Sequence, residues 1–343
     1  MSLTMRIAIV NDTLMIVEVL RRIVVNISEY KLIWIASNGM EAVKNCTLDT
    51  PDLILMDIVM PGMDGVEATR QIMKQCPCAI LMVTVSIEKY AAKVFQAMGY
   101  GALDAVNTPV FSQEQKDITS SLHKKIATIA RLIDKSSHRR SPPIPESTNS
   151  YQGKPLPPLI AIGASTGGPQ ALLTILSQFP PDINAAVAII QHIDAEFAPD
   201  FAKWLNQQIA IPVELATPGC FPEAGKIIVA GTNNHLVINP NLSFAYQSQH
   251  QDCIYHPSID VFFKSLANYW QGRGIGVILT GMGRDGAAGL KAMRDKGWHT
   301  IAQNHQTCIV YGMPKAAIEL KAAVEVLSVE TIASQIIQQL KLI

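Results

Sequence analysis

A serine stands in a glycine-containing turn near the middle of the chain. The segment LIAIGASTGGPQAL, residues 159–172, ends an apolar run at Gly163, Ser165 and Gly167, which fit the pattern G-x-S-x-G. Such a strand-to-helix turn exposes the serine hydroxyl, and the helix that follows offers free N–H groups to an oxyanion. The pattern predicts a nucleophilic Ser165; capping of the following helix by Ser165 or Thr166 is the competing interpretation.

Two kinds of phosphate-binding loop compete for the same segment. A dinucleotide-binding fingerprint requires glycine where Ser165 stands and an acidic residue at the end of the next strand, and the sequence has neither. A P-loop requires a Gly-Lys-Ser/Thr ending, which the segment lacks. Both forms of nucleotide binding are therefore disfavoured.

A nucleophilic serine needs a base, and the base needs an acid that orients it. His192 follows the apolar run AAVAIIQ, which places it on the same sheet edge as Ser165. Asp285 follows a third apolar run, in GVILTGMGRDGAAGL, where the many glycines indicate a backbone packed close to a reacting group. A structural role for His192 and a helix cap at Asp285 are the competing interpretations. The chain order Ser, His, Asp differs from that of the α/β-hydrolases, so another fold is expected.

A second group of polar residues lies in the first third of the chain. The segment LILMDIVMPGMDG places Asp57 at the end of an apolar run, Asp12 follows the first such run and Thr84 ends the fourth. Carboxyl ends of parallel strands converge at one sheet edge. Two carboxylates, a hydroxyl and backbone oxygens such as that of Val59 suit Mg²⁺, and a carboxylate beside Mg²⁺ can accept a phosphoryl group. Capping of the next loop by Asp57 is the competing interpretation.

The elements that must position these residues follow from the apolar runs. In the N-terminal half the runs MRIAIV, LIWIAS, DLILMD, AILMVT and ALDAVN alternate with helical patterns, which predicts a flavodoxin-like, five-stranded parallel sheet with helices on both faces. Residues 112–134 are predicted as an amphipathic helix. The stretch 134–158, rich in Pro, Ser and charge, is predicted as an exposed linker.

The alternation resumes after the linker. The runs PLIAIGA, AAVAIIQ, GIGVILT and HTIAQ predict a doubly wound, mostly parallel α/β domain. Short, turn-rich runs between residues 211 and 247 predict an antiparallel hairpin excursion. We therefore expect a receiver-like unit over 5–125, a helix extension and linker over 126–157, and a hydrolytic domain over 158–343.

Composition limits the classes of protein to consider. The 343 residues carry a formal net charge of zero, which favours neither nucleic acid nor an anionic membrane as a partner. The apolar runs are shorter than the ~20 residues of a membrane span, and no export signal precedes the first strand. The six cysteines form no paired C-x-x-C pattern. We expect a cytoplasmic protein with reduced thiols, without nucleic-acid binding or membrane insertion.

The N-terminal motifs DLILMDIVMPGMDG and VT at 83–84 resemble the receiver domain of two-component response regulators. The resemblance implies that a chemotaxis-type histidine kinase phosphorylates Asp57. It also implies Mg²⁺ held by Asp12, Asp57 and the backbone of Val59, with Thr84 as the switch residue.

The C-terminal motifs IGASTGGP, QHI, HPSID, ILTGMGRDGAAGL, TIAQN and YGMP resemble the catalytic domain of chemotaxis protein-glutamate methylesterases. The resemblance implies Ser165 as nucleophile, His192 as general base and Asp285 as orienting acid, with the amides of Thr166 and Met282 in the oxyanion hole. It further implies hydrolysis of glutamate methyl esters on methyl-accepting chemoreceptors, which releases methanol. Glutamine deamidation is an implied second activity, and catalysis requires no cofactor.

The chain departs from both family patterns at four positions. Asn11 stands where receivers carry the first of two acids, Thr108 replaces a lysine and Ala105 an aromatic switch residue. His256 stands where methylesterases usually have arginine. The loss of the lysine partner predicts weaker phosphorylation and weaker switching. The segments VNDT and NTP resemble those of a subgroup that serves surface-sensing systems.

Two other functions remain to be weighed. The first is a non-catalytic receptor-binding module controlled by phosphorylation, against which the presence of all three triad residues argues. The second is a DNA-binding response regulator, for which the C-terminal half offers neither a helix-turn-helix candidate nor a basic patch.

Overall fold

The computed structural model describes residues 4–109, 122–130, 156–248 and 255–342. They fall into two compact units, divided after Ser136. Of the helix predicted over 112–134, residues 122–130 are described and are helical. The rest of that helix, and all but the last three residues of the linker predicted over 134–158, lie outside the described residues.

The N-terminal unit contains a five-stranded parallel sheet, as the apolar runs predicted. Its strands are ordered β2-β1-β3-β4-β5. Their bounds are β1 (Met5–Val10), β2 (Tyr30–Ala36), β3 (Leu53–Asp57), β4 (Ala79–Thr84) and β5 (Asp104–Asn107).

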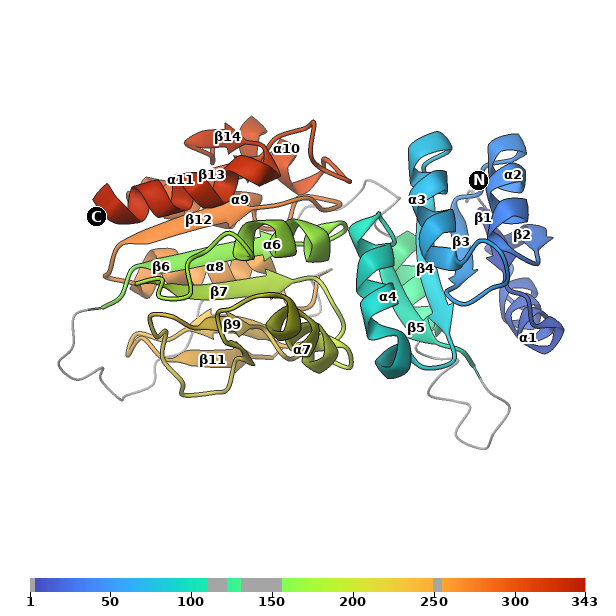
Figure 1. Ribbon diagram of the computed structural model, residues 1–343, viewed down its shortest axis with the longest axis horizontal. Helices are drawn as coiled ribbons and strands as arrows, with labels where there is room; N and C mark the ends of the chain where they lie inside the picture. Colours follow the sequence, from blue (N-terminus) through green and yellow to red (C-terminus); the bar gives the residue numbers. More distant parts are fainter. Residues whose placement is uncertain (1–3, 110–121, 131–155, 249–254, 343) are drawn as a thin grey trace. The chain divides into compact units, whose positions relative to one another are not determined.

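Four helices and the helical stretch 122–130 cover this sheet (Figure 1). The helices are α1 (Leu14–Val25), α2 (Gly39–Leu48), α3 (Gly65–Gln75) and α4 (Ile87–Gly99). A side-chain oxygen just before each of the last three accepts a hydrogen bond from an amide in the first turn, which defines where the helix begins. Apolar residues of α1 and of 122–130 share one core with the central strands.

The C-terminal unit is built on a seven-stranded parallel sheet in the order β14-β13-β12-β6-β7-β9-β8. The bounds are β6 (Leu159–Ala164), β7 (Ala186–Gln191), β8 (Val213–Leu215), β9 (Ile227–Val229), β12 (Gly274–Ile278), β13 (His299–Gln303) and β14 (Glu325–Leu327). The doubly wound α/β prediction is therefore confirmed.

The strands between residues 211 and 247 differ in part from the prediction. Only β10 (His235–Ile238) and β11 (Phe244–Gln247) form an antiparallel hairpin. Strands β8 and β9 pair in parallel and extend the main sheet instead. Each has only three residues, too few for a periodicity that would distinguish a parallel from an antiparallel partner.

Helices cover both faces of this second sheet. Helices α6 (Gly168–Leu176) and α11 (Val329–Leu342) pack together on one face (Figure 1). Helices α8 (Ile259–Tyr269), α9 (Ala287–Asp295) and α10 (Met313–Glu319) share a large apolar core on the other face, and α7 (Ala198–Gln208) packs beside β8. Among the described residues, none of the helices has the length and apolar character that crossing a bilayer requires.

Candidate active site

Ser165 and His192 lie side by side at the carboxyl edge of the seven-stranded sheet. In the paired strands β6 and β7, Ala164 lies opposite Gln191. Ser165 directly follows Ala164, and His192 directly follows Gln191. The amide of His192 donates to the carbonyl of Ala164 at 3.0 Å, and the amide of Ser165 donates to that of Thr280 at 3.1 Å. The backbone of both residues is thus held by neighbouring strand ends.

The helix-capping interpretation of Ser165 and Thr166 is wrong. Helix α6 begins at Gly168 after Gly167, whose φ is +80°, and no side chain caps its first turn. Ser165 is 8% exposed, and its carbonyl accepts from the amide of Gly168 and from the side chain of Gln191. Within the described residues its hydroxyl has no hydrogen-bond partner, which leaves it available for chemistry.

The His192 ring is bound through one of its two nitrogens. Nε2 lies 2.8 Å from Oδ2 of Asp285. Because an ionised carboxylate only accepts, this contact places the ring proton on Nε2. Nδ1 is buried and has no partner within the described residues. The free, unprotonated nitrogen is the one that a general base requires.

Asp285 is held by the first turn of α8 and does not cap its own helix. Helix α9 begins after Gly286 without a side-chain cap. The carboxylate of Asp285 instead accepts from the Ser258 hydroxyl at 2.8 Å, the Ile259 amide at 2.7 Å and the Asp260 amide at 3.0 Å. The capping interpretation is therefore wrong for this residue as well.

These contacts keep Asp285 ionised. Burial opposes its charge, but the hydrogen bond and charge of His192 and the α8 amides outweigh burial, so the pKa of Asp285 lies below its usual value. Burial, followed by the charge of Asp285, raises the pKa of neighbouring Asp260 to about 6. Asp285 is thus the first of this acidic pair to ionise.

Two residues at the site are not among the predicted site residues. The ring of Tyr255 stacks on that of His192, with 4.5 Å between centroids and 14° between planes, and its hydroxyl donates to the carbonyl of Met282. Gln191 supports the Ser165 turn through the contact described above. The residue types alone do not predict these roles, because each residue contacts another that is distant in the sequence.

The glycines around Asp285 allow close packing, as predicted. A Cβ on Gly281 would lie 2.6 Å from Cβ of Ser165. A Cβ on Gly283, whose φ is +82°, would lie 1.8 Å from the Tyr255 hydroxyl. The loop between β12 and α9 therefore reaches the nucleophile only because these side chains are absent.

The two predicted oxyanion donors lie in the turns beside Ser165. Thr166 directly follows the serine, and Met282 follows Gly281, which packs against it. Within the described residues, neither amide finds an acceptor. Free N–H groups are the donors that a developing oxyanion needs.

His256, the departure from the family pattern, packs against a second histidine. Its ring tilts against that of His235, with 5.3 Å between centroids. His235 is fully buried, and its Nδ1 accepts from the amide of Ser258 at 3.0 Å. The histidine pair thus supports the segment from which α8 begins.

The N-terminal unit carries its own polar cluster at the carboxyl edge of its sheet. Asp57 accepts from the side chain of Asn11 at 3.0 Å and from the amide of Ile58 at 2.7 Å. Burial raises the pKa of Asp57 to about 6, against the pull of the Ile58 and Val59 amides, and the charge of Asp12 adds to the rise. The structure therefore places Asp12 close enough to Asp57 for the two charges to interact.

This cluster fits a hard divalent cation. The predicted ligands, the carboxylates of Asp12 and Asp57 and the backbone carbonyl of Val59, would offer oxygen atoms alone, which is the donor type that Mg²⁺ takes. The hydroxyls of Thr84 and Thr108 are buried and unpartnered within the described residues. Thr108, which replaces the receiver lysine, brings no charge to this edge.

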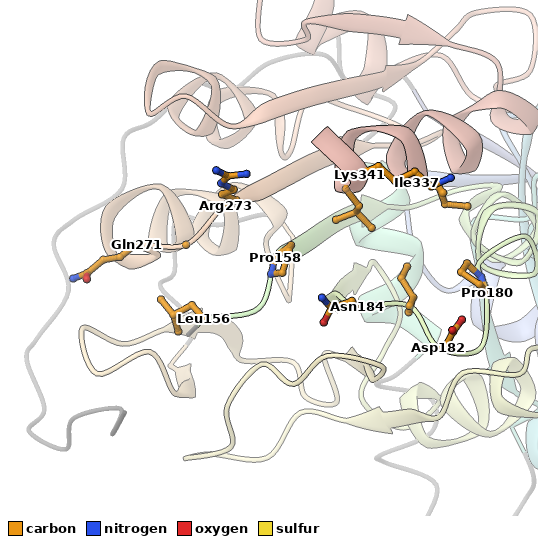
Figure 2. Close-up of a pocket in the computed structure, with 12 residues that line it drawn as sticks. Leu156, Pro158, Pro180, Asp182, Asn184, Gln271, Arg273, Ile337 and Lys341 are labelled. Carbon is orange, nitrogen blue, oxygen red and sulfur yellow. The ribbon is translucent and has the colours of Figure 1, made fainter. Parts of the chain in front are cut away.

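Another hollow of the C-terminal unit lies away from this site. A cavity of about 750 Å³ lies at the amino edge of β6 and β12, opposite the edge that carries Ser165 (Figure 2). Arg273, Lys341 and Asp182 are among its lining residues. None of the predicted catalytic residues lines it.

Comparison with known proteins decides the family. A model of the CheB methylesterase matches residues 160–336, and a model of the response regulator receiver domain matches residues 7–120. The chain belongs to the CheB methylesterase family. Both resemblances found in the sequence motifs are therefore confirmed, and with them the esterase class of enzyme.

Two relatives match this chain over nearly their whole length. The protein-glutamate methylesterase/protein-glutamine glutaminase 3 of Pseudomonas aeruginosa is 49% identical over 334 residues, which cover 97% of this chain and 98% of that protein. A protein of the same name, without the number, from Mesorhizobium japonicum is 49% identical over 338 residues, with 97% and 98% covered. The crystal structure of the Thermotoga maritima CheB methylesterase catalytic domain is 29% identical with a TM-score of 0.51, and covers 55% of this chain and 99% of that one.

Proposed function

We propose that this CheB methylesterase hydrolyses glutamate methyl esters on methyl-accepting chemoreceptors and releases methanol, with glutamine deamidation as a second activity. The observation that carries the proposal is the hydrogen bond between Nε2 of His192 and Asp285. It leaves Nδ1 without a partner among the described residues, at a strand end that neighbours the one followed by Ser165. The names of the full-length relatives support the substrate class.

The reaction begins when Ser165 Oγ attacks the ester carbonyl carbon and its proton passes to Nδ1 of His192. Asp285 stabilises the resulting imidazolium through Nε2. The amides of Thr166 and Met282 donate to the carbonyl oxygen as it gains negative charge. His192 then returns the proton to the leaving methoxide oxygen, and methanol departs.

Water completes the cycle. His192 Nδ1 takes a proton from a water molecule, which attacks the acyl-serine, and the serine oxygen recovers the proton as glutamate is freed. A glutamine side chain follows the same path with ammonia as the leaving group. The stacked ring of Tyr255 keeps the His192 ring in its plane through both steps.

The receiver unit is proposed to control this activity. A chemotaxis-type histidine kinase would phosphorylate Asp57, with Mg²⁺ held by Asp12, Asp57 and the Val59 carbonyl. When bound, the metal neutralises charge on the transferred phosphoryl group. In the unphosphorylated state the receiver obstructs the Ser165 site, and phosphorylation weakens the obstruction. Thr108 and Ala105 predict modest activation, since the lysine and the aromatic switch residue are missing.

Loss of the serine hydroxyl tests the esterase. We expect Ser165→Ala to lower methanol release from methylated receptor by ~10³-fold or more, because no other group can form the acyl intermediate. Ser177→Ala, at the exposed end of α6, is the control and should retain activity. A fluorophosphonate should label the native chain and not Ser165→Ala. Methanol release by Ser165→Ala at the native rate would refute the assignment and favour a non-catalytic binding module.

A further inference from the structure

Three cysteines gather at the amino edge of the receiver sheet, away from the phosphorylation site. Cys46 lies in the last turn of α2, Cys76 directly follows α3, and Cys78 directly precedes β4. The sulfur atoms of Cys46 and Cys78 are 4.0 Å apart, although 32 positions separate the two residues. The fold, and not the local sequence, brings these two thiols together.

The three thiols differ in their access to solvent. Cys46 is fully buried, and its thiol donates to the carbonyl of Cys76 at 3.5 Å. Cys76 is also buried, with its sulfur 3.9 Å from the Thr47 hydroxyl. Cys78 is partly exposed. An oxidant in solution therefore reaches Cys78 before the two buried cysteines.

The raised pKa values of Cys46 and Cys76 also disfavour these two residues as the first to be oxidised. The neighbouring Cys78 thiol and burial raise the pKa of Cys46 far above its usual range, and burial raises that of Cys76 to about 11. Both buried residues are thus held as thiols, which react slowly with oxidants. When Cys78 is oxidised, the Cys46 sulfur lies 4.0 Å from the Cys78 sulfur.

The geometry singles out one pairing. A disulfide bond is about 2.05 Å long, so the Cys46 and Cys78 sulfurs must approach by about 2 Å, which side-chain rotation of the partly exposed residue provides. Cys76 and Cys78 are separated only by Pro77, whose ring restricts the backbone and disfavours the strained ring that their union would close. Cys46 is therefore the favoured partner.

We propose that Cys46 and Cys78 form a reversible disulfide when the protein meets a hydroperoxide. The Cys78 sulfur attacks one peroxide oxygen, the O–O bond breaks, and water leaves a sulfenic acid on Cys78. The Cys46 sulfur then attacks the Cys78 sulfur, and the hydroxyl departs with the Cys46 proton as a second water. Two thiols and one hydrogen peroxide thus give one disulfide and two waters. A dithiol reductant restores both thiols.

The bond would tie the end of α2 to the start of β4. Because it closes a loop within the receiver unit, oxidation should raise the unfolding temperature of that unit. Asp57 lies at the opposite, carboxyl edge of the sheet, so the modification is distinct from phosphorylation. The inference does not depend on the esterase activity.

Peptide mapping of the full chain tests the pairing. Reduced protein is treated with equimolar hydrogen peroxide, free thiols are alkylated, and the chain is digested with trypsin. We expect peptides 45–70 and 75–89 to be joined, with a mass lower than their sum by two hydrogens, and to separate after reduction. Thermal unfolding of oxidised and reduced native protein needs no variant and should show a higher temperature after oxidation.

Serine variants identify the partners, since Cys76 and Cys78 share one tryptic peptide. Cys76→Ser and Cys220→Ser should retain the cross-link, whereas Cys46→Ser and Cys78→Ser should abolish it. A cross-link that persists in Cys78→Ser, or one that joins Cys76 to Cys78, would overturn the proposal. So would oxidation of Cys78 to sulfinic acid without any cross-link.

Discussion

At the residue scale, the site depends on which nitrogen of His192 carries the proton. Asp285 accepts hydrogen bonds from α8 on both oxygens and from His192 on one of them. Only a group without protons of its own can accept from all of these donors. The identity of Asp285 therefore determines the tautomer of the base, and so whether Ser165 has an acceptor for its proton.

Asp285→Asn tests this dependence. The new amide donates to Nε2, which moves the ring proton to Nδ1 and leaves Ser165 without a base. We expect turnover to fall by up to ~10⁴-fold, the loss seen when a triad acid is amidated in serine proteases. The measurement is methanol release, with thermal unfolding to show that the fold persists. Asp295→Asn, on the exposed surface of α9, should leave turnover unchanged. Native turnover in Asp285→Asn would mean that another group orients His192.

At the element scale, the first turn of α8 binds Asp285, which follows strand β12 of the main sheet. Its free amides would be unsatisfied without an acceptor, and Asp285 supplies one. Ser258 takes part twice, since its hydroxyl donates to Asp285 and accepts from the Val261 amide. The amide of Ser258 donates to the buried His235 ring. The start of α8 therefore contains a helix cap and also holds Asp285, the proposed orienting acid.

Ser258→Ala tests two roles of the Ser258 hydroxyl, as the cap of α8 and as a donor to Asp285. Loss of the cap should destabilise the protein by about 1 kcal/mol. Loss of one donor to Asp285 should reduce turnover by roughly fivefold, the equivalent of one hydrogen bond of about 1 kcal/mol. Ser258→Thr keeps the hydroxyl and should restore most of both. Thermal unfolding and methanol release measure the two effects. Unchanged turnover in a destabilised Ser258→Ala would show that the two α8 amides alone suffice for Asp285.

At the scale of the whole molecule, two compact units each carry a polar cluster at the carboxyl edge of a parallel sheet. The N-terminal unit offers Asp57 and Asp12, and the C-terminal unit offers Ser165, His192 and Asp285. The units are joined by a segment of about 25 residues rich in Pro and Ser, long enough to permit docking and release. The proposed control of the Ser165 site by the receiver must therefore be tested on a chain that carries both units.

Truncation and phosphorylation test this control. Residues 155–343 alone should release methanol faster than the full chain, because the obstructing receiver is gone. A small phosphodonor should activate the full chain modestly, and Asp57→Asn should abolish that response while its basal turnover persists. Glu29→Gln, on the receiver but outside its polar cluster, is the control and should respond normally. Equal rates for the truncated and full-length proteins would show that the receiver does not inhibit.

The sequence alone determined the strand ends and the residues that follow them. Ser165, His192 and Asp285 could be selected because carboxyl ends of parallel strands converge, and because each residue directly follows an apolar run or its glycine loop. The same rule selected Asp12, Asp57 and Thr84. These inferences need only the local periodicity and the topology that it implies. The same information therefore also predicts the fold of both units.

Only the tertiary structure decided what those residues contact. Three contacts join positions at least 25 residues apart. They are the hydrogen bonds from α8 to Asp285, the stacking of Tyr255 on His192 and the proximity of Cys46 to Cys78. The parallel pairing of β8 and β9, with Val213 opposite Ile227, was also decided by the tertiary structure. No local pattern encodes such contacts, because they arise from how helices and strands pack after they form, when burial and unsatisfied hydrogen-bonding groups select partners across the whole fold.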